Sequence, residues 1–198
     1  ELGSRPVRYA EIRSYLETLA DISDRVELVR MGKSHEGREL FSLFISSPRN
    51  IQELSSIQED MKRLGDPRIT DTDASGRIIE DSPAIAWMMY NVHGNELSGT
   101  DASLALAYHL SAGNDSTIRN ILENLVVVID PTQNPDGRER SLTQLEQWSG
   151  EIESTDPQDL QHSGLWPGGR TNHYFFDMNR DWFILSQPET RARVRAIL

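Results

Sequence analysis

The sequence predicts an α/β fold, with a mostly parallel or mixed central sheet and helices on both of its faces. Two apolar runs, at 84–90 and 124–130, have the length and composition of strands that are buried on both faces. Segments with apolar residues at helical spacing precede, separate and follow these runs. Because no internal repeat or low-complexity segment interrupts this alternation, we expect a single α/β unit.

The N-terminal third is expected to form a helix, a hairpin and a second helix. Residues 9–22 carry apolar residues at helical spacing with charges between them, which is typical of an amphipathic helix. Residues 26–31 and 40–46 have strand-like patterns on either side of a glycine-bounded turn at 32–37, which predicts a hairpin. Residues 50–64 repeat the helical pattern.

The rest of the chain is expected to alternate connecting segments with helices. The polar, acidic stretch 66–81 is predicted to be an exposed loop, and residues 100–110 a packed helix. Turn-forming residues at 131–137 end the second apolar run. Roughly thirty polar residues then lead to a Gly-Gly-Arg sequence, and a loop that long is usually functional or mobile. Residues 186–189 have the Ser-x-x-Glu spacing of a capping box that opens a last helix.

The composition excludes several classes of function. The chain has 20 Lys+Arg against 31 Asp+Glu, a formal net charge of −11, which argues against binding nucleic acid because that requires a basic surface. No apolar run approaches the roughly eighteen residues that span a bilayer, so we expect no membrane insertion. The absence of Cys excludes a disulfide scaffold, Cys-based zinc sites and a Cys nucleophile.

The turn that follows the first apolar run contains His93 and Glu96. In open α/β sheets, ligands bind beyond the carboxyl ends of the strands, which is where this turn and Asn134 are expected to lie. Zinc binds imidazole nitrogen and carboxylate oxygen, and a catalytic zinc site needs three protein ligands and a water. A spacing of three residues allows both side chains to bind one ion. The same pattern also suits an ordinary surface turn after a strand.

A second group of candidates lies near the end of the chain. Asn179 and Arg180 could hold a carboxylate, since a guanidinium binds it with two hydrogen bonds. Asp177 beside a ligating His would fix the tautomer of that His, and Arg170 could stabilise an oxyanion. The alternatives are a structural Asp–Arg pair at the sheet edge and an arginine that is merely solvated.

Four separated segments carry a family resemblance when they are considered in order. They are GKSHEGREL at 32–40, HGNE at 93–96, NPDGR at 134–138 and GRTNHYFFDMNRDW at 169–182. With these segments, which extend over nearly the whole chain, the sequence resembles the zinc carboxypeptidases of the carboxypeptidase A type, the M14 metallopeptidases.

The resemblance implies a role for each candidate residue. His93 and Glu96 would be two of the three zinc ligands, in a family whose ligand set is two His and one Glu. Asp177 would accept a hydrogen bond from the first His. Asn179 and Arg180 would bind the terminal carboxylate of the substrate, and Arg170 would polarise the scissile carbonyl.

One part of the family pattern is not present in these 198 residues. The third ligand, a His, and the general-base Glu follow the Asn-Arg motif in the family, and we expect both beyond residue 198. His162 and His173 are the nearby imidazoles, but neither stands where the family has a ligand. The resemblance therefore implies that residues 1–198 are the N-terminal portion of a single catalytic domain, with a sheet that is incomplete at the C-terminus and no activity on its own.

The leading hypothesis is a zinc-dependent metallocarboxypeptidase that removes C-terminal residues from peptides with a free carboxylate, using a zinc-activated water. One alternative keeps the fold and changes the substrate: a zinc amidase or deacylase, including a cell-wall peptide hydrolase. Another is a peptide-binding module without catalytic activity. By analogy with bacterial members of the family, we expect the protein to be exported.

Overall fold

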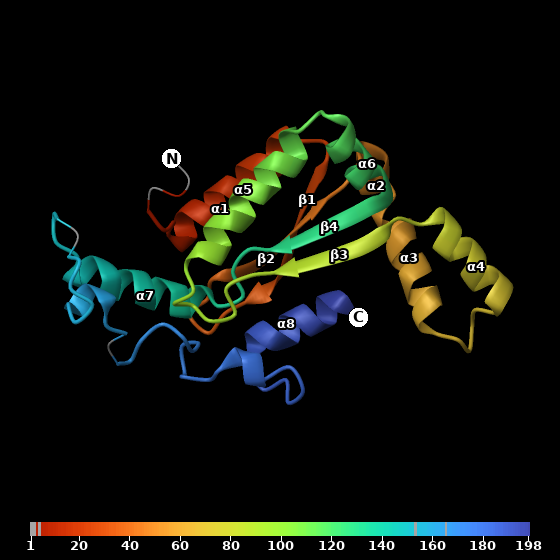
Figure 1. Ribbon diagram of the computed structural model, residues 1–198. Helices are drawn as coiled ribbons and strands as arrows, with labels where there is room; N and C mark the ends of the chain where they lie inside the picture. The colour runs from red at the N-terminus through yellow and green to blue at the C-terminus, as the bar shows by residue number, and fades with distance from the viewer. Residues whose placement is uncertain (1–2, 4, 153, 165) are drawn as a thin grey trace.

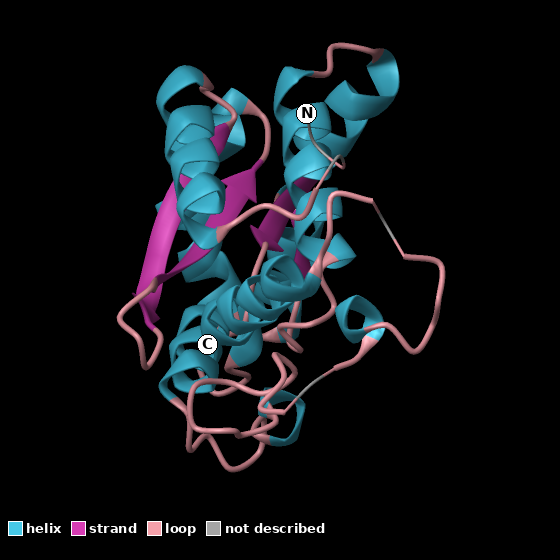
Figure 2. Ribbon diagram, turned by 90° about the vertical axis from the view of Figure 1, so that its left-hand side faces the viewer, coloured by secondary structure: helices cyan, strands magenta, loops and turns pink. Residues whose placement is uncertain are grey.

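The computed structural model describes residues 3, 5–152, 154–164 and 166–198. Helices pack on both faces of one four-stranded sheet, as Figures 1 and 2 show. The strands are β1 (Val26–Lys33), β2 (Glu39–Ile45), β3 (Ala84–Met89) and β4 (Leu125–Asp130). The α-helices are α1 (Tyr9–Ile22), α2 (Pro48–Gln52), α3 (Leu54–Gly65), α4 (Thr72–Asp81), α5 (Ser98–Ala112), α6 (Ser116–Asn124), α7 (Pro135–Trp148) and α8 (Pro188–Ile197). Two short 3₁₀ helices, η1 (Leu160–His162) and η2 (Met178–Arg180), lie between α7 and α8.

The sheet is mixed, in the order β1-β2-β4-β3. β1 pairs antiparallel with β2, and β2 pairs antiparallel with β4. Only β3 and β4 are parallel among the described strands. The predicted α/β class with helices on both faces is confirmed, although antiparallel pairing is more extensive than a largely parallel sheet would have. The predicted hairpin at 26–46 is also confirmed.

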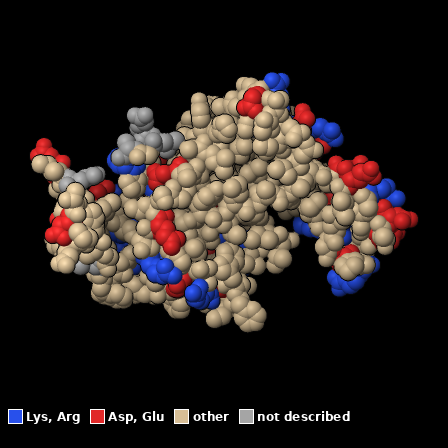
Figure 3. Space-filling model, in the orientation of Figure 1, with Lys and Arg blue, Asp and Glu red and all other residues tan. Residues whose placement is uncertain are grey.

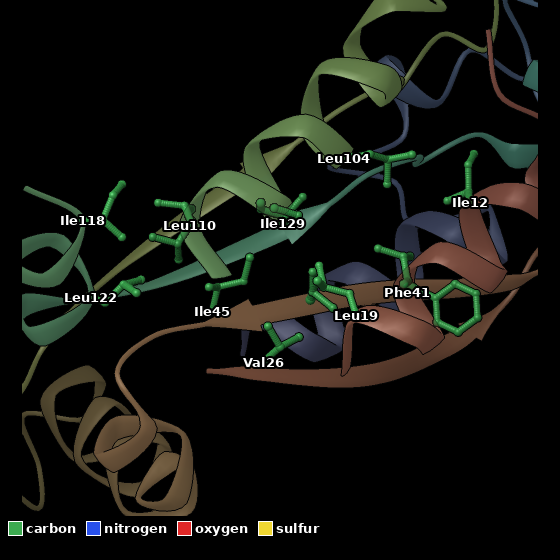
Figure 4. Packing of buried hydrophobic residues seen from close by; sticks show 14 residues of the cluster. Ile12, Leu19, Val26, Phe41, Ile45, Leu104, Leu110, Ile118, Leu122 and Ile129 are labelled. Carbon is green, nitrogen blue, oxygen red and sulfur yellow. The ribbon is translucent and has the colours of Figure 1, made fainter. Parts of the chain in front are cut away.

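The larger core lies between the sheet and the helices α1, α5 and α6 (Figure 4). Alternate residues of the central strands, such as Leu43 and Ile129, face these helices and are fully buried. The residues between them, such as Val126 and Val128, pack on the other face against Ile57 of α3. Because successive side chains of a strand point to opposite faces, β4 contributes to both cores.

β3 differs from its predicted environment. The run 84–90 forms a strand as expected, but its ends are exposed, with Ile85 at 44% and Met89 at 39% of their full accessibility. β3 is an edge strand and pairs only with β4 in the described part of the sheet. The exposed apolar residues of β3 lie along the side of the strand that has no neighbour among the described residues.

Several helix predictions need correction. The stretch 66–81 is not a loop: α4 occupies 72–81, because Asp71 caps it and Ile78 is buried. The helix expected at 50–64 is divided into α2 and α3 at Glu53. α7 fills the first part of the long segment that was expected to be a loop, and residues 153 and 165 of that segment lie outside the described residues.

The last helix begins as predicted but is held differently. Gln187, and not Ser186, is the N-cap residue of α8, and no side chain forms a capping hydrogen bond there. The apolar residues at helical spacing near its end, Val194, Ile197 and Leu198, are half-buried or exposed, whereas Glu189 and Arg193 are buried. A polar contact attaches this helix to the sheet, because Arg193 binds the carboxylate of Asp130 at the end of β4.

The Arg193–Asp130 pair joins α8 to the centre of the sheet. Arg193 also donates to the carbonyls of Thr132 and Glu189, so its donors are well used. Burial raises the pKa of Asp130, and the charge and hydrogen bonds of Arg193 oppose that rise. Such a pair is costly to break because the remaining charge stays buried.

None of the helices in the described ranges is long and apolar enough to cross a membrane. On the face drawn in Figure 3, Lys and Arg side chains are interspersed with Asp and Glu.

Arg193→Ala should lower the free energy of unfolding by about 3–5 kcal/mol, because Asp130 would keep a buried charge without its partner. Arg195→Ala, on an exposed position of the same helix, is the matched control and should change it by less than about 0.5 kcal/mol. Urea denaturation of both variants measures the difference, and equal effects would contradict the role given to the pair.

Candidate metal and peptide-binding site

Three loops that are distant in sequence meet at the carboxyl ends of β3 and β4. They are the turn 91–96, the start of α7 at 134–138, and the segment 168–172. The main chain joins them: Gly94 N–H donates to the carbonyl of Arg170, and Asn134 N–H donates to the carbonyl of Asn91. The expectation that His93 and Asn134 lie beyond the ends of neighbouring strands is confirmed.

Three glycines allow this close approach. A Cβ on Gly94 would lie 2.2 Å from the backbone of Gly137, and a Cβ on Gly137 would lie 2.5 Å from the carbonyl oxygen of Gly169. A Cβ on Gly169 would lie 2.4 Å from the carbonyl oxygen of Gly137. Real Cβ atoms do not come so near to backbone, so any other residue would push the loops apart.

Asn91 shapes the turn that carries the two candidate ligands. It adopts a positive φ of 57°, a conformation that Asn tolerates better than most residues. Its side-chain amide donates to the carbonyls of His93, at 2.7 Å, and Glu96, at 3.0 Å, and its oxygen accepts from Thr132. The hydrogen bonds of Asn91 therefore fix the main chain at both candidate ligands.

His93 is buried and lies between two carboxylates. Its Nδ1 atom is 2.9 Å from Oε1 of Glu96, and its Nε2 atom is 3.2 Å from Oδ1 of Asp177. Asp177 also binds Arg170, with Nη2 3.2 Å from Oδ2. The structure thus brings His93, Glu96, Asp177 and Arg170 together, from segments more than seventy residues apart.

The charge on Asp177 is favoured by its neighbours. Partial burial acts to raise the pKa of Asp177, but the N–H of Asn179, His93 and Arg170 outweigh that effect and lower it below its ordinary value. An ionised carboxylate accepts hydrogen bonds only, so Asp177 can hold the Nε2 side of the His93 ring by accepting from it. The other ring nitrogen, Nδ1, faces Glu96.

Asn179 and Arg180 lie on η2, directly after Asp177. Asp177 caps η2 through the N–H of Asn179, at 3.0 Å, so the carboxylate that holds His93 also sets the position of these two residues. Both side chains are exposed. Within the described residues, the hydrogen bonds of the Arg180 side chain go only to the carbonyl of Asn179, which leaves most of its donors for a ligand.

The remaining histidines near the site have other contacts. His173 Nδ1 is 2.9 Å from Oε1 of Glu36, and His162 Nε2 is 2.7 Å from the carbonyl of Ser154. In the part of the chain that the structure describes, no three His, Cys, Asp or Glu side chains are grouped so that they could hold a metal ion.

The sequence marks the NPDG segment as a turn and as a family motif, but does not predict the contacts that Asp136 makes. Asp136 is buried and accepts from Ser34, at 2.7 Å, and from Arg38, at 2.7 Å, and from the N–H of Glu36. It thereby docks the hairpin turn at 32–38 against the site. The sequence signal for this contact was an acidic residue in one motif and a Ser and an Arg in another motif of the same family pattern.

The chain matches the zinc carboxypeptidase family model, Peptidase_M14, over residues 12–194. It belongs to the zinc carboxypeptidase family. This confirms the resemblance of the four motifs, and the activity that defines the family is zinc-dependent removal of C-terminal residues from peptides.

Individual zinc carboxypeptidases are similar at moderate identity. Carboxypeptidase D from Mus musculus is 26% identical over 194 residues, 96% of this chain and 11% of that protein. Carboxypeptidase Z from Mus musculus is 25% identical over 179 residues, 88% of this chain and 21% of that protein. The chain thus spans a tenth to a fifth of the curated relatives that it matches.

Solved structures agree on the fold. A metallo-carboxypeptidase from Burkholderia cenocepacia superposes with a TM-score of 0.61 and 18% identity, over 97% of this chain and 38% of that one. Carboxypeptidase A from Helicoverpa armigera gives a TM-score of 0.55 and 18% identity, over 98% of this chain and 42% of that one.

The donor atoms present fit the zinc of the family in part. Nδ1 of His93 lies 2.9 Å from a carboxylate oxygen of Glu96, and Nε2 faces the acceptor Asp177, which is the arrangement of a His–carboxylate ligand pair. Two ligands fit; a third is not among the described residues.

Asp177→Asn in the full-length protein should weaken zinc binding by about tenfold or more, because a neutral amide holds the Nε2 tautomer of His93 less firmly. Asp73→Asn is the control, on α4 before the opposite end of β3. Competition with a chromophoric chelator measures both dissociation constants. Unchanged zinc affinity in Asp177→Asn would contradict the orienting role.

Proposed function

We propose that the protein is a zinc-dependent metallocarboxypeptidase and that residues 1–198 contribute the N-terminal portion of its catalytic domain. The observation that carries the proposal is the position of His93 between Glu96 and Asp177, with Arg170 on the same Asp177 carboxylate. The family membership supports the reaction class.

In this proposal His93, through Nδ1, and Glu96 are two ligands of the zinc ion. When bound, zinc supplies a Lewis acid and a water whose pKa is lowered to about 7. The chain's own contribution is to fix the direction in which Nδ1 points. Asp177 does this by accepting the Nε2 proton, and Asn91 does it by holding the turn.

Arg170 is proposed to stabilise the oxyanion that forms on the scissile carbonyl. Its side chain is half exposed, and within the described ranges a single hydrogen bond, to Asp177, holds the guanidinium, so further donors can reach a substrate oxygen. Its main chain is fixed more firmly, since its carbonyl accepts from Gly94 and Asn134.

Asn179 and Arg180 are proposed to bind the terminal carboxylate of the peptide. A guanidinium and an amide side by side can give several hydrogen bonds to one carboxylate. Their position on η2, two and three residues after Asp177, links the anchor for the substrate to the residue that orients His93. Such a clamp would select free C-termini and make the enzyme an exopeptidase.

The third zinc ligand and the general-base Glu are proposed to come from outside these 198 residues. The support is that the two donors present do not complete a ligand set in the described part of the chain, and that the chain covers 38% and 42% of the two carboxypeptidase structures named above. On the family resemblance alone, we also propose that the protein is exported.

Peptides with a free C-terminus should be trimmed one residue at a time by the full-length protein, and 1,10-phenanthroline should abolish trimming until zinc is restored. C-terminal amidation of the same peptides should lower kcat/KM by about a hundredfold or more, because Arg180 and Asn179 lose their charged partner. Mass spectrometry of the products measures both effects.

Other outcomes of that experiment identify other functions. Chelator-sensitive cleavage at a rate that C-terminal amidation does not change would favour the zinc amidase or deacylase. Binding of peptides with free C-termini, without cleavage, would favour a peptide-binding module. Either result would overturn the carboxypeptidase proposal.

Residues 1–198 produced alone should hydrolyse no peptide, because two protein ligands hold zinc weakly and the general base is missing. The measurement is peptide trimming with excess zinc, with circular dichroism to verify that the chain is folded. Chelator-sensitive trimming by the folded chain would show that the complete catalytic set lies within these residues.

A further inference from the structure

A cavity of about 670 Å³ lies next to the candidate site, between α7 and the segment that leads from η1 to Arg170. Figure 1 shows this segment running back past α7 at one end of the molecule. Ser141, Gln144 and Leu145 of α7 form one wall. This volume is in the range of pockets that bind small ligands or side chains.

The cavity is continuous with the site at two residues. Asn95 stands between the two proposed ligands, and Arg170 is the proposed oxyanion stabiliser, and both line the cavity. Asn179 and Arg180 do not line it. The cavity therefore opens from the reacting centre without including the proposed carboxylate clamp.

This placement indicates which part of a peptide could enter. The inference rests on the proposed function: if the terminal carboxylate is at Arg180 and the scissile carbonyl at Arg170, the remaining substrate extends only away from the clamp. The substrate residues that extend from Arg170 in that direction are those on the N-terminal side of the scissile bond. The cavity beside Arg170 is thus placed to receive one of their side chains.

The lining favours an apolar side chain. The large apolar groups are Leu97, Leu145, Leu160, Trp166 and Phe175. Of the described lining residues, none is Asp, Glu or Lys, and the ionisable ones are Arg170 and His162. His162 is turned to the carbonyl of Ser154, at 2.7 Å. A cationic substrate side chain would have no carboxylate to pair with here.

The aromatic wall of the cavity is held in place although it is exposed. Trp166 is 81% exposed, and its ring centroid is 5.0 Å from that of Phe175. Arg140 lies over the Phe175 ring at 5.1 Å. Phe175 has a positive φ of 65°, and the buried Asn172 fixes its turn by accepting from the N–H groups of Tyr174 and Phe176. A fixed, exposed aromatic pair is suited to pack against an apolar partner.

We propose that this cavity, through Trp166, Phe175 and Leu160, is the specificity pocket for an apolar or aromatic side chain on the N-terminal side of the scissile bond. It selects among substrates by one of the two residues that precede that bond.

The test uses the full-length, zinc-loaded protein and two series of tetrapeptides with a constant C-terminal residue. One series varies the penultimate residue and the other the preceding one, each among Gly, Leu, Phe, Lys and Glu. In one series kcat/KM should be about tenfold or more higher for Phe than for Gly, with Lys and Glu near Gly.

Trp166→Ala should reduce the Phe-to-Gly ratio of kcat/KM by about fivefold or more, since the aromatic wall is lost. Trp166→Phe keeps an apolar ring and should retain most of the ratio. Trp148→Ala is the matched control, because Trp148 is a half-exposed tryptophan at the end of α7 that does not line the cavity. It should leave the ratio unchanged.

A second readout does not depend on turnover. In chelator-treated protein, a peptide with Phe at the selected position should change tryptophan fluorescence on binding, and Trp166→Phe should remove most of that change. Circular dichroism of each variant verifies folding, and the Leu160→Ala variant repeats the test if Trp166→Ala fails to fold.

The proposal is overturned if wild-type ratios are near one in both series, or if Trp166→Ala and Trp148→Ala have the same effect on the ratio. A cavity that is filled by chain outside residues 1–198 would give the first of these results. Failure of the proposed function is distinct, since no peptide of either series would then be trimmed in a chelator-sensitive manner.

Discussion

The close contact of Gly94, Gly137 and Gly169 is the constraint on which the site depends. These residues belong to three loops, and each lies where a Cβ would overlap the backbone of another loop. With hydrogen atoms as side chains, the backbones approach closely enough for the Gly94 N–H to reach the carbonyl of Arg170. The position of Arg170 relative to His93 follows from that approach, because the two residues adjoin Gly169 and Gly94.

Buried carboxylates hold the same arrangement from outside. Asp136 attaches the hairpin turn at 32–38, and Asp130 attaches α8 through Arg193. Asp181 accepts from the main-chain N–H groups of Ser186 and Gln187 and so closes the loop before α8. Each carboxylate has donors that match its charge, so that burial is compensated. The loops around the site are thereby fixed although they contain little regular structure.

Much of the fold could be predicted from local pattern. α1, the hairpin and β4 have clear periodicity or apolar runs, and the structure has them where expected. α4 and α7 were missed because their sequences are polar and acidic, and few of their residues face a core; caps at Asp71 and Asn134 define their starts.

The two outcomes for α8 illustrate the limit of periodicity. Its existence was predictable, but its buried face was not, because Arg193 and Glu189 take positions that an apolar pattern assigns to the surface. Whether a charged residue is buried depends on a partner elsewhere in the chain. For Arg193 that partner is Asp130, 63 positions away.

The amino-acid sequence by itself determined the family, because the four ordered motifs can be recognised without any knowledge of contacts. It also named His93, Glu96, Asp177 and Arg170 as candidates. It could not assign atoms. Only the tertiary structure decided that Nε2 of His93 faces Asp177 while Nδ1 faces Glu96, and that a cavity with an aromatic wall adjoins Arg170. The physical reason is that a motif specifies residue types along the chain, whereas direction and distance arise where the glycine contacts bring separate loops together.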